Sequence, residues 1–554
     1  MQKFTIFVRC LAIYTMLSGL RQYLDYLDGE GELIRIKEFV NPVLEIACLT
    51  DMEAKKPGGG KALLFENTGT DFPVVTNMMG SEKRMLRTLS LESFDDLEKR
   101  IDDIAGSLLS EKKGILEKLR MLPLLKDAVS WLPADFKGDA PCQEVIQFKP
   151  RLSALPVLKC APLDGGRFIT LPLVNTQSPV TGIRNVGMYR MQVIDDCTTG
   201  MHWHKHKTGA KHLNECTHRL PVAVCLGGDP IYSYAATAPL PEGVDEYLLA
   251  GFLRGKPVQL VQCMTQSLKV PADCDFVIEG YVQKSEEKFM EGPFGDHTGF
   301  YSLADLYPKF HVTCITHRKD AIYPATVVGI PPQEDKYIQL ATEKIFLKPV
   351  KMAVAPEVED LYLPEEGTGH NFAIVRISKA YEGQAFKVAN ALWGAGQMMF
   401  NKFLIVVDGQ TDIRNRESVK SAIEKNWLPS RDTLLSQGPM DILDHTAPVQ
   451  GIGGKMCIDA TSHPEGGTGR PFGEIVKVVF DECEKESSIY RKLWLVGANC
   501  DALRDSYIDG ETLTLDARSK RNMPGFTREW PDIISYDEAT VGRCRDIARN
   551  NHLI

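Results

Sequence analysis

Three histidines alternate with other residues in the segment MHWHKHKTG, residues 201–209. On a β-strand, alternate side chains point to the same face, so His202, His204 and His206 would converge there. Converging imidazoles can bind a divalent metal, and a carboxylate or amide oxygen elsewhere would complete an octahedral site of the Mg or Mn type. A solvated strand face with pH-sensitive histidines explains the same spacing equally well.

Two carboxylates lie in the segment EGPFGDHTGFY, residues 291–301, which holds three Gly and one Pro. Such a composition predicts a tight loop that exposes its backbone, and this loop can present Glu291 and Asp296 to a common point. Neighbouring carboxylates beside an Arg have shifted pKa values, as an acid/base pair requires. A solvated acidic turn is an equally good interpretation of this segment alone.

Three glycines precede Lys455 in the segment GIGGKM, residues 451–456. Backbone amides beside a lysine suit a phosphate group. The spacing is not that of a P-loop, and a glycine-rich connector explains such a string more often. Gly394 and Gly396 fall within a helical pattern and do not form a dinucleotide-binding fingerprint.

The composition excludes several classes of protein. At 554 residues the chain is long enough for about three or four domains, so it is not a lone binding module. A net charge of −9 gives no general attraction to nucleic acid or to anionic lipid. The 14 Cys are scattered singly without a CxxC, which points to a reducing cytoplasm and not to a disulfide framework.

The amino-terminal part of the chain is expected to form a small α/β unit that supports these segments. Residues 1–15 contain Arg9 within an apolar run and no small-x-small cleavage site, so we expect an upstream extension with Met16 as an alternative start. Residues 16–140 form the expected N-terminal α/β domain. Its predicted elements are helices at 20–27, 38–55 and 93–118 and strands at 33–36 and 62–65.

The rest of the chain divides into three further parts. Residues 141–330 carry short β-rich runs at 169–174, 188–193, 222–226, 258–263, 276–282 and 310–315, which are typical of a barrel or a sandwich. Residues 331–500 form a second α/β domain, with a β-α-β unit over 372–377, 386–393 and 403–407 that is expected to pair its strands in parallel. Residues 501–554 form a polar tail with a terminal helix at 538–550.

Five segments together resemble one family. They are NVGMYRMQV (185–193), MHWHKHKTG (201–209), EYLLAGFLRGKPVQLV (246–261), EGPFGDHTGFY (291–301) and GGKMCIDAT (453–461). Their order and spacing resemble those of the UbiD-like decarboxylases, the polyprenyl-hydroxybenzoate carboxy-lyase family. The resemblance runs from about Met16 through Thr461 and extends more loosely to the carboxyl end.

The resemblance implies an α+β multidomain fold, in which a central split β-barrel of the flavin-reductase type holds prenylated FMN between N- and C-terminal α/β domains. It implies a reversible, non-oxidative decarboxylation of an aromatic or α,β-unsaturated acid. Asn185, His206 and Glu246 match the ligands of a Mn ion that bridges protein and flavin phosphate, and a monovalent cation such as K⁺ often accompanies it. His202 and His204 are then neighbours of the cofactor and not metal ligands.

The resemblance also assigns cofactor and catalytic positions. The implied catalytic network is Arg190, Glu291 and Asp296, with Asp296 as the proton donor. A carboxylic acid can donate a proton near neutral pH only if its pKa is raised, so we expect a raised pKa for Asp296. The implied cofactor contacts are Met188, Tyr189, Arg190, His202, Trp203, His204, Lys207, Thr208 and Lys455.

The substrate and partners follow less directly. Ile330 stands where ubiquinone-pathway members commonly carry Arg, so polyprenyl-hydroxybenzoate is the favoured substrate while a smaller phenolic, heteroaromatic or α,β-unsaturated acid remains open. The resemblance further implies a homo-oligomer, from dimer to hexamer, supplied by a flavin prenyltransferase, with peripheral membrane contact if the substrate is polyprenylated. A catalytically silent flavin- or metal-binding protein is the alternative of another class. A zinc hydrolase is disfavoured because the chain lacks HExxH.

Overall fold

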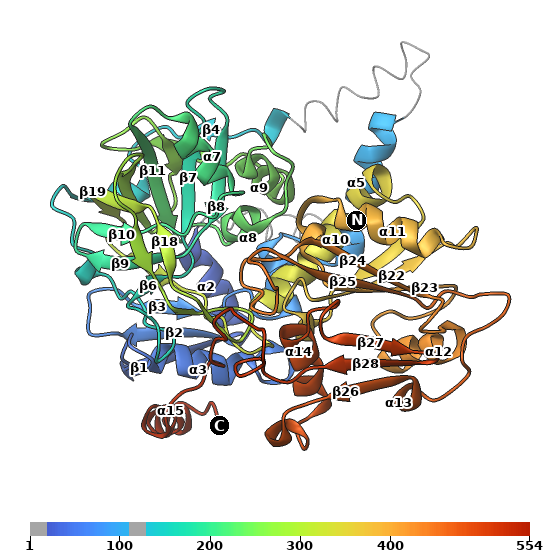
Figure 1. Ribbon diagram of the computed structural model, residues 1–554. Helices are drawn as coiled ribbons and strands as arrows, with labels where there is room; N and C mark the ends of the chain where they lie inside the picture. The colour runs from blue at the N-terminus through green and yellow to red at the C-terminus, as the bar shows by residue number, and fades with distance from the viewer. Residues whose placement is uncertain (1–18, 110–128) are drawn as a thin grey trace, which may run out of the picture.

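The computed structural model describes residues 19–109 and 129–554. The amino-terminal and central parts of the chain lie together, and the second α/β part packs beside them (Figure 1). The proposed extension at 1–15 and residues 110–118 of the predicted third helix lie outside the described residues.

The first unit is a four-stranded sheet with helices on both faces. Its strand order is β1-β2-β3-β20, from β1 (Leu33–Phe39), β2 (Ala62–Asn67), β3 (Val74–Thr76) and β20 (Tyr323–Pro324). Helix α2 (Leu20–Gly29) covers one face with Leu20, Tyr23, Leu24 and Leu27, as their helical spacing predicts. Helix α3 (Glu45–Ala54) covers the other face, and α4 (Glu82–Thr88) and α5 (Phe94–Leu109) follow.

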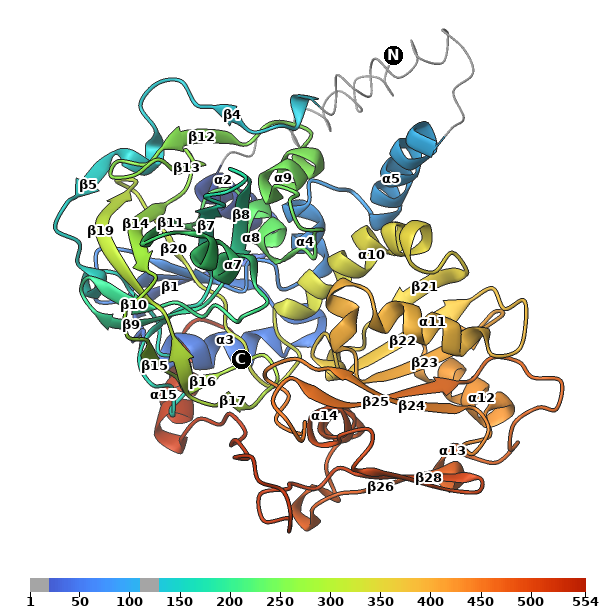
Figure 2. The same cartoon turned by 45° about the horizontal axis from the view of Figure 1, so that its top comes forward.

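The central unit is a nine-stranded antiparallel sheet that curls into a half-barrel (Figure 2). Its strand order is β6-β9-β10-β19-β14-β11-β7-β8, with β5 on the side of β19. The bounds are β5 (Val145–Gln147), β6 (Phe168–Ile169), β7 (Leu173–Gln177), β8 (Arg184–Met188), β9 (Met191–Asp195), β10 (Thr198–Gly200), β11 (Arg219–Leu226), β14 (Phe276–Gln283) and β19 (Lys309–His317).

Two hydrophobic cores lie on opposite faces of this sheet. Along β11, Val222 and Val224 enter the core shared with α3, whereas Ala223 and Cys225 enter the core formed with α4, α8, α9 and α10. The helices are α7 (Thr208–Glu215), α8 (Ile231–Thr237), α9 (Glu246–Arg254) and α10 (Asp335–Ala353). Smaller strands complete the unit: β4 (Ala134–Asp135), β12 (Gln259–Gln262), β13 (Lys269–Pro271), β15 (Phe289–Glu291), β16 (Phe294–Gly295), β17 (Tyr301–Ser302) and β18 (Asp305–Tyr307).

The third unit is a five-stranded sheet of order β21-β22-β23-β25-β24. The β-α-β prediction is confirmed, because β22 (Phe372–Ile377) and β23 (Phe403–Asp408) pair in parallel and α11 (Gln384–Trp393) connects them. Even-numbered residues of β23 face α11, and odd-numbered residues face α12 (Arg416–Asn426) and α14 (Ile489–Asn499). The remaining strands are β21 (Val358–Tyr362), β24 (Thr433–Pro439) and β25 (Ile452–Asp459).

The last part of the chain returns to the first unit. After α13 (Phe472–Ile475), the strands β26 (Val476–Val479), β28 (Thr512–Asp516) and β27 (Ser506–Asp509) form a small sheet. Residues 518–537 then lead to α15 (Glu538–Asn550), the predicted terminal helix, which packs against α3 (Figure 2). Lys56 donates to the carbonyl of Leu553 at 2.5 Å, so the carboxyl-terminal segment is tied to the first unit just after α3.

Several predicted boundaries were wrong for local reasons. The helix expected over 38–55 begins only at Glu45, because β1 continues to Phe39 and Pro42 follows it. The predicted strands 169–174 and 188–193 are each broken by a turn that separates two shorter strands. No helix of the described chain is long and apolar enough to cross a membrane. Every cysteine in the described residues is a free thiol.

Candidate active site

Arg190 lies at the centre of a buried ionic network, in the short turn between β8 and β9. Its Nε donates to Glu291 Oε1 at 3.1 Å, and one terminal nitrogen pairs with Asp296 Oδ2. Its other terminal nitrogen donates to Ser302 Oγ at 3.0 Å. The structure therefore brings the three predicted catalytic residues together around one guanidinium.

The loop that carries Glu291 and Asp296 is held through its backbone amides. Gly292 N donates to Gln192 Oε1 at 2.7 Å, and Gly295 N donates to Asp164 Oδ1 at 2.7 Å. A Cβ on Gly165 would lie 2.2 Å from the carbonyl oxygen of Gly292, so only glycine permits this close approach. The sequence interpretation missed Asp164, Gln192 and Ser302, although the Asp-Gly-Gly string at 164–166 is a signal for such a turn.

Glu291 is held ionised in the interior. Burial raises its pKa, but the charge of Arg190 and the hydrogen bond from His202 outweigh burial and lower the pKa below its ordinary value. His202 Nδ1 lies 2.7 Å from Glu291 Oε1, while burial and Arg190 lower the pKa of His202. The pair is therefore a neutral imidazole that donates to a carboxylate.

The pKa of Asp296 differs from the expectation. Burial acts to raise it, but the charge of Arg190 and the hydrogen bonds from His297 outweigh burial, so the pKa of Asp296 lies well below its usual range. The expectation of a raised pKa was wrong for this arrangement, because a buried carboxylate paired with Arg is stabilised in its charged form. Asp296 is a carboxylate here, and it must gain a proton before it can donate one.

The histidine segment is not a strand. Residues 201–204 have no regular structure and are followed by a turn at 205–206, although the three rings still lie near one another. The ring centroids of His202 and His204 are 4.4 Å apart, and those of His204 and His206 are 5.9 Å apart. Among the described residues, no group of three His, Cys, Asp or Glu side chains could hold a metal ion. The three imidazoles do not form a metal site by themselves.

The alternative ligand set combines an amide, an imidazole and a carboxylate. Asn185 is buried on β8, and its side-chain amide nitrogen has no hydrogen-bond partner. Glu246 is the first residue of α9, where its Oε2 accepts from Val186 N at 2.8 Å and burial raises its pKa to about 7. His206 is exposed in the turn before α7. Asn185 can offer an amide oxygen and Glu246 a carboxylate that is costly to ionise without a cation, and oxygen ligands of this kind fit a hard divalent ion.

The positions assigned to the cofactor fall into two groups. Most of them lie from the last residue of β8 into the connection that follows it, or from the segment before α7 to its first residue: Met188, Tyr189, Arg190, His202, Trp203, His204, Lys207 and Thr208. Lys455 lies apart on β25 and is buried, with Nζ donating to the carbonyls of Met399 at 2.6 Å and Asn401 at 2.7 Å. The structure does not bring Lys455 into the Arg190 network.

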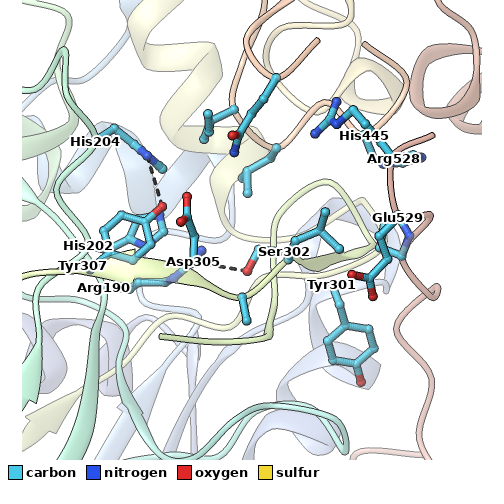
Figure 3. A pocket seen from close by; sticks show the side chains of 16 residues that line it. Arg190, His202, His204, Tyr301, Ser302, Asp305, Tyr307, His445, Arg528 and Glu529 are labelled. Atoms are coloured by element: carbon cyan, nitrogen blue, oxygen red, sulfur yellow. Dashed lines mark hydrogen bonds between the residues drawn. The ribbon is translucent and has the colours of Figure 1, made fainter. Parts of the chain in front are cut away.

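A pocket of about 260 Å³ opens beside Arg190. Figure 3 shows Arg190, His202, His204 and Tyr307 on one side of this pocket and His445, Arg528 and Glu529 on the other. His204 Nδ1 lies 3.2 Å from the Tyr307 hydroxyl, and burial lowers the pKa of His204 to about 3, so His204 lines this wall as a neutral imidazole. Residues of the central unit, the third unit and the tail thus line one pocket.

Three family models match the chain. Those of the N-terminal domain, the Rift-related domain and the C-terminal domain of 3-octaprenyl-4-hydroxybenzoate carboxy-lyase match residues 24–104, 135–331 and 336–460. An uncharacterized protein of Aquifex aeolicus is 46% identical over 479 residues, which cover 86% of this chain and 98% of that protein. One of Archaeoglobus fulgidus is 42% identical over 483 residues with the same coverage.

Solved structures of similar proteins include a decarboxylase and a UbiD-class enzyme. Vanillic acid decarboxylase of Sedimentibacter hydroxybenzoicus in its closed form is 30% identical with a TM-score of 0.69, covering 80% of this chain and 92% of that chain. The UbiD-class enzyme HmfF of Pelotomaculum thermopropionicum, in complex with FMN, is 27% identical with a TM-score of 0.67, covering 80% and 94%. The chain therefore belongs to the UbiD family of carboxy-lyases, the class of aromatic acid decarboxylases.

Proposed function

We propose that this protein catalyses the reversible, non-oxidative decarboxylation of an aromatic acid, with prenylated FMN and Mn as cofactors. The observation that carries the proposal is the convergence of Glu291, Asp296 and Arg190 beside a pocket. A catalytically silent binding protein has no need for two buried carboxylates around one guanidinium next to a pocket, because buried charges are costly to maintain.

The cofactor assignment is supported by the family and by the local chemistry. HmfF has been solved with FMN and, in an evolved dimeric form, with prFMN. In this chain, Asn185, His206 and Glu246 would hold a Mn ion, and the ion together with Lys207 would supply positive charge for the flavin phosphate. The curled central sheet would act as the flavin-binding split barrel, and a K⁺ ion would accompany the Mn ion. When bound, the prenylated flavin supplies the electron sink that decarboxylation needs.

The protein's own residues would then bind the acid and manage the proton. Arg190 borders the pocket with its positive charge, so it attracts the carboxylate of the substrate. Glu291 is fully buried and holds the guanidinium of Arg190 in place through its ion pair with Nε. Asp296 would deliver the proton to the ring carbon that loses CO₂. The low pKa of Asp296 requires that another group reload it.

The substrate remains a choice between two chemical classes. Polyprenyl-hydroxybenzoate is the favoured candidate from the family resemblance, with a role in quinone biosynthesis and peripheral membrane contact. The similarity to vanillic acid decarboxylase supports a smaller phenolic acid equally directly. We propose a homo-oligomer that works in the cytoplasm and receives its cofactor from a flavin prenyltransferase.

The deciding experiment compares two carboxylate variants of protein produced together with a flavin prenyltransferase. Asp296→Asn keeps the shape of the side chain but cannot donate a proton, so CO₂ release should fall by a factor on the order of 10² or more while flavin content is unchanged. Asp305 is an exposed residue that lines the same pocket without contacting Arg190, and Asp305→Asn is the matched control. Equal activity in both variants would refute the proton-donor assignment. If the wild-type protein with bound flavin released CO₂ from none of a panel of aromatic acids, the result would favour the alternative that the protein binds flavin without catalysing a reaction.

A further inference from the structure

The proton that Asp296 needs must come from a neighbouring group. Its Oδ2 is paired with Arg190, which remains protonated at all working pH values and cannot act as a donor. Its Oδ1 lies 2.9 Å from His297 Nδ1 and also accepts the backbone amide of His297 at 2.8 Å. Among the side chains bonded to Asp296 in the described structure, only His297 can exchange a proton near neutral pH.

The backbone fixes this contact. Asp296 N donates to the carbonyl of Phe300 at 3.0 Å, and Gly299 N donates to the carbonyl of Asp296 at 3.0 Å. Gly299 has φ of +86°, and a Cβ there would lie 2.7 Å from the ring of Trp494, which is fully buried. The turn that presents His297 to Asp296 is therefore held by its own hydrogen bonds and by packing against α14.

His297 also connects the buried carboxylates to solvent. Its side chain is 29% exposed, whereas that of Asp296 is 11% exposed and that of Glu291 is not exposed. Solvent can thus reach the imidazole, whereas the two carboxylates are largely enclosed. A residue that takes protons from water and passes them to a buried group must be more exposed than that group, as His297 is.

The charges around His297 favour its protonated form. Besides Asp296, it faces Asp335 at the start of α10 and Asp441 after β24, and the ring of His370 lies 5.6 Å away. Burial acts to lower the pKa of His297, but the hydrogen bond with Asp296 and the three carboxylate charges outweigh it and raise the pKa to about 9. Burial lowers the pKa of His370, so this neighbour is neutral and adds little opposing charge.

We propose that His297 is the proton-loading residue of the active site, which takes a proton from solvent and passes it to Asp296. This proposal rests on the proposed decarboxylase function. In the first step, the Nδ1–H bond breaks and an O–H bond forms at Asp296 Oδ1, leaving a neutral imidazole and a neutral carboxylic acid. In the second step, Asp296 gives this proton to the ring carbon that has lost CO₂ and becomes a carboxylate again. His297 then takes one proton from water, so each turnover consumes one solvent proton.

The test replaces His297 with a residue that keeps the hydrogen bond but cannot carry a proton. In His297→Gln we expect unchanged flavin content and a decarboxylation rate reduced by a factor on the order of 10², the lower end of the range for a lost general acid. Because the side chain is partly exposed, added imidazole should restore part of the rate. The wild-type rate should fall above a pH of about 9, where His297 loses its proton, and the variant should lose this dependence.

The matched control is His370→Gln, which removes the neighbouring imidazole without a contact to Asp296. It should keep a rate within about threefold of wild type and the same fall at high pH, together with an unchanged flavin content. A rate, a pH profile and an imidazole response in His297→Gln that equal those of wild type would overturn the proposal. If Asp296→Asn were inactive in the same experiment, the proposed function would stand without it.

A second measurement does not depend on activity. In flavin-free protein with isotope-labelled histidine, the NMR titration of His297 should show a pKa well above the ordinary value of about 6.5. In Asp296→Asn, this pKa should fall because the main stabilising charge is removed. An ordinary pKa for His297 in both proteins would show that the imidazole holds no proton to give, and the proposal would be wrong.

Discussion

The variant Asp164→Asn should change catalytic activity and folding stability by different amounts, because Asp164 both positions the catalytic loop and carries a buried charge. Burial raises the pKa of Asp164 from 3.8 to about 6, although the amides of Cys160, Ala161 and Gly295 all donate to its carboxylate. Each pKa unit corresponds to about 1.4 kcal/mol, so ionised Asp164 costs the folded state about 3 kcal/mol at pH 7.5. Asparagine is uncharged and avoids this cost, but its side chain has one oxygen where aspartate has two. It therefore loses the hydrogen bonds either from Gly295 or from Cys160 and Ala161, a loss of about 1–3 kcal/mol.

The two effects have opposite signs, and only the cost of ionising Asp164 depends on pH. The cost of ionising Asp164 is absent below pH 3.8 and complete only above about pH 6, so at pH 5 it is about half as large. We therefore expect the stability of Asp164→Asn relative to wild type to fall by about 1–2 kcal/mol between pH 7.5 and pH 5, measured from the thermal midpoints of both proteins at the two pH values.

The activity should respond differently from the stability. If asparagine keeps its oxygen toward Cys160 and Ala161, the Gly295 amide is released, and a misplacement of about 1 Å beside Asp296 costs on the order of 10² in rate. CO₂ release by flavin-loaded protein at pH 7.5 measures this loss. Asp196→Asn is the control, because Asp196 also accepts a backbone amide, at 2.9 Å from Ser153, but lies at the surface. Full activity of Asp164→Asn, or a stability difference independent of pH, would refute the reasoning.

Three further predictions concern the metal site and the third unit. Glu246→Gln removes the negative charge from the proposed ligand set, so purified protein should retain several-fold less Mn and flavin by elemental analysis and absorbance, and unchanged contents would exclude Glu246 as a ligand. His206→Ala should lose more Mn than His204→Ala, and the opposite order would mean that the wrong histidine was chosen. Lys402 is paired with Asp444 at 2.8 Å with both side chains almost fully buried, so Lys402→Met should destabilise the protein by about 3–5 kcal/mol in denaturant unfolding, and a change below about 1 kcal/mol would contradict this estimate.

The sequence was most informative where local pattern and tertiary environment agree. The apolar runs 372–377 and 403–407 form central parallel strands, because both of their faces are covered by helices and continuous apolar runs are then required. The terminal helix at 538–550 begins at an Asp537 cap that accepts the amide of Thr540, a signal that is legible in the sequence. The convergence of Arg190, Glu291 and Asp296 was available only through the family resemblance, since 101 residues separate Arg190 from Glu291.

Other features could not be read from the sequence. Alternation of His202, His204 and His206 is compatible with a strand, but the segment finds no partner strand and follows an irregular path. The direction of the Asp296 pKa depends on whether burial or Arg190 dominates, and this balance is set by three-dimensional distances. The domain divisions at 15/16, 140/141, 330/331 and 500/501 remain predictions.

The docking of α15 on α3 has a consequence for the order in which the chain acquires its structure. Ile547 and Ala548 of α15 belong to the same hydrophobic core as Ile46 and Leu49 of α3. Because these partners are about 500 positions apart along the chain, the apolar face of α3 leaves the ribosome long before the surface that covers it. At roughly 5–20 residues per second, that interval lasts about half a minute or more. Chaperone binding to nascent chains that end before α15 should therefore map to α3.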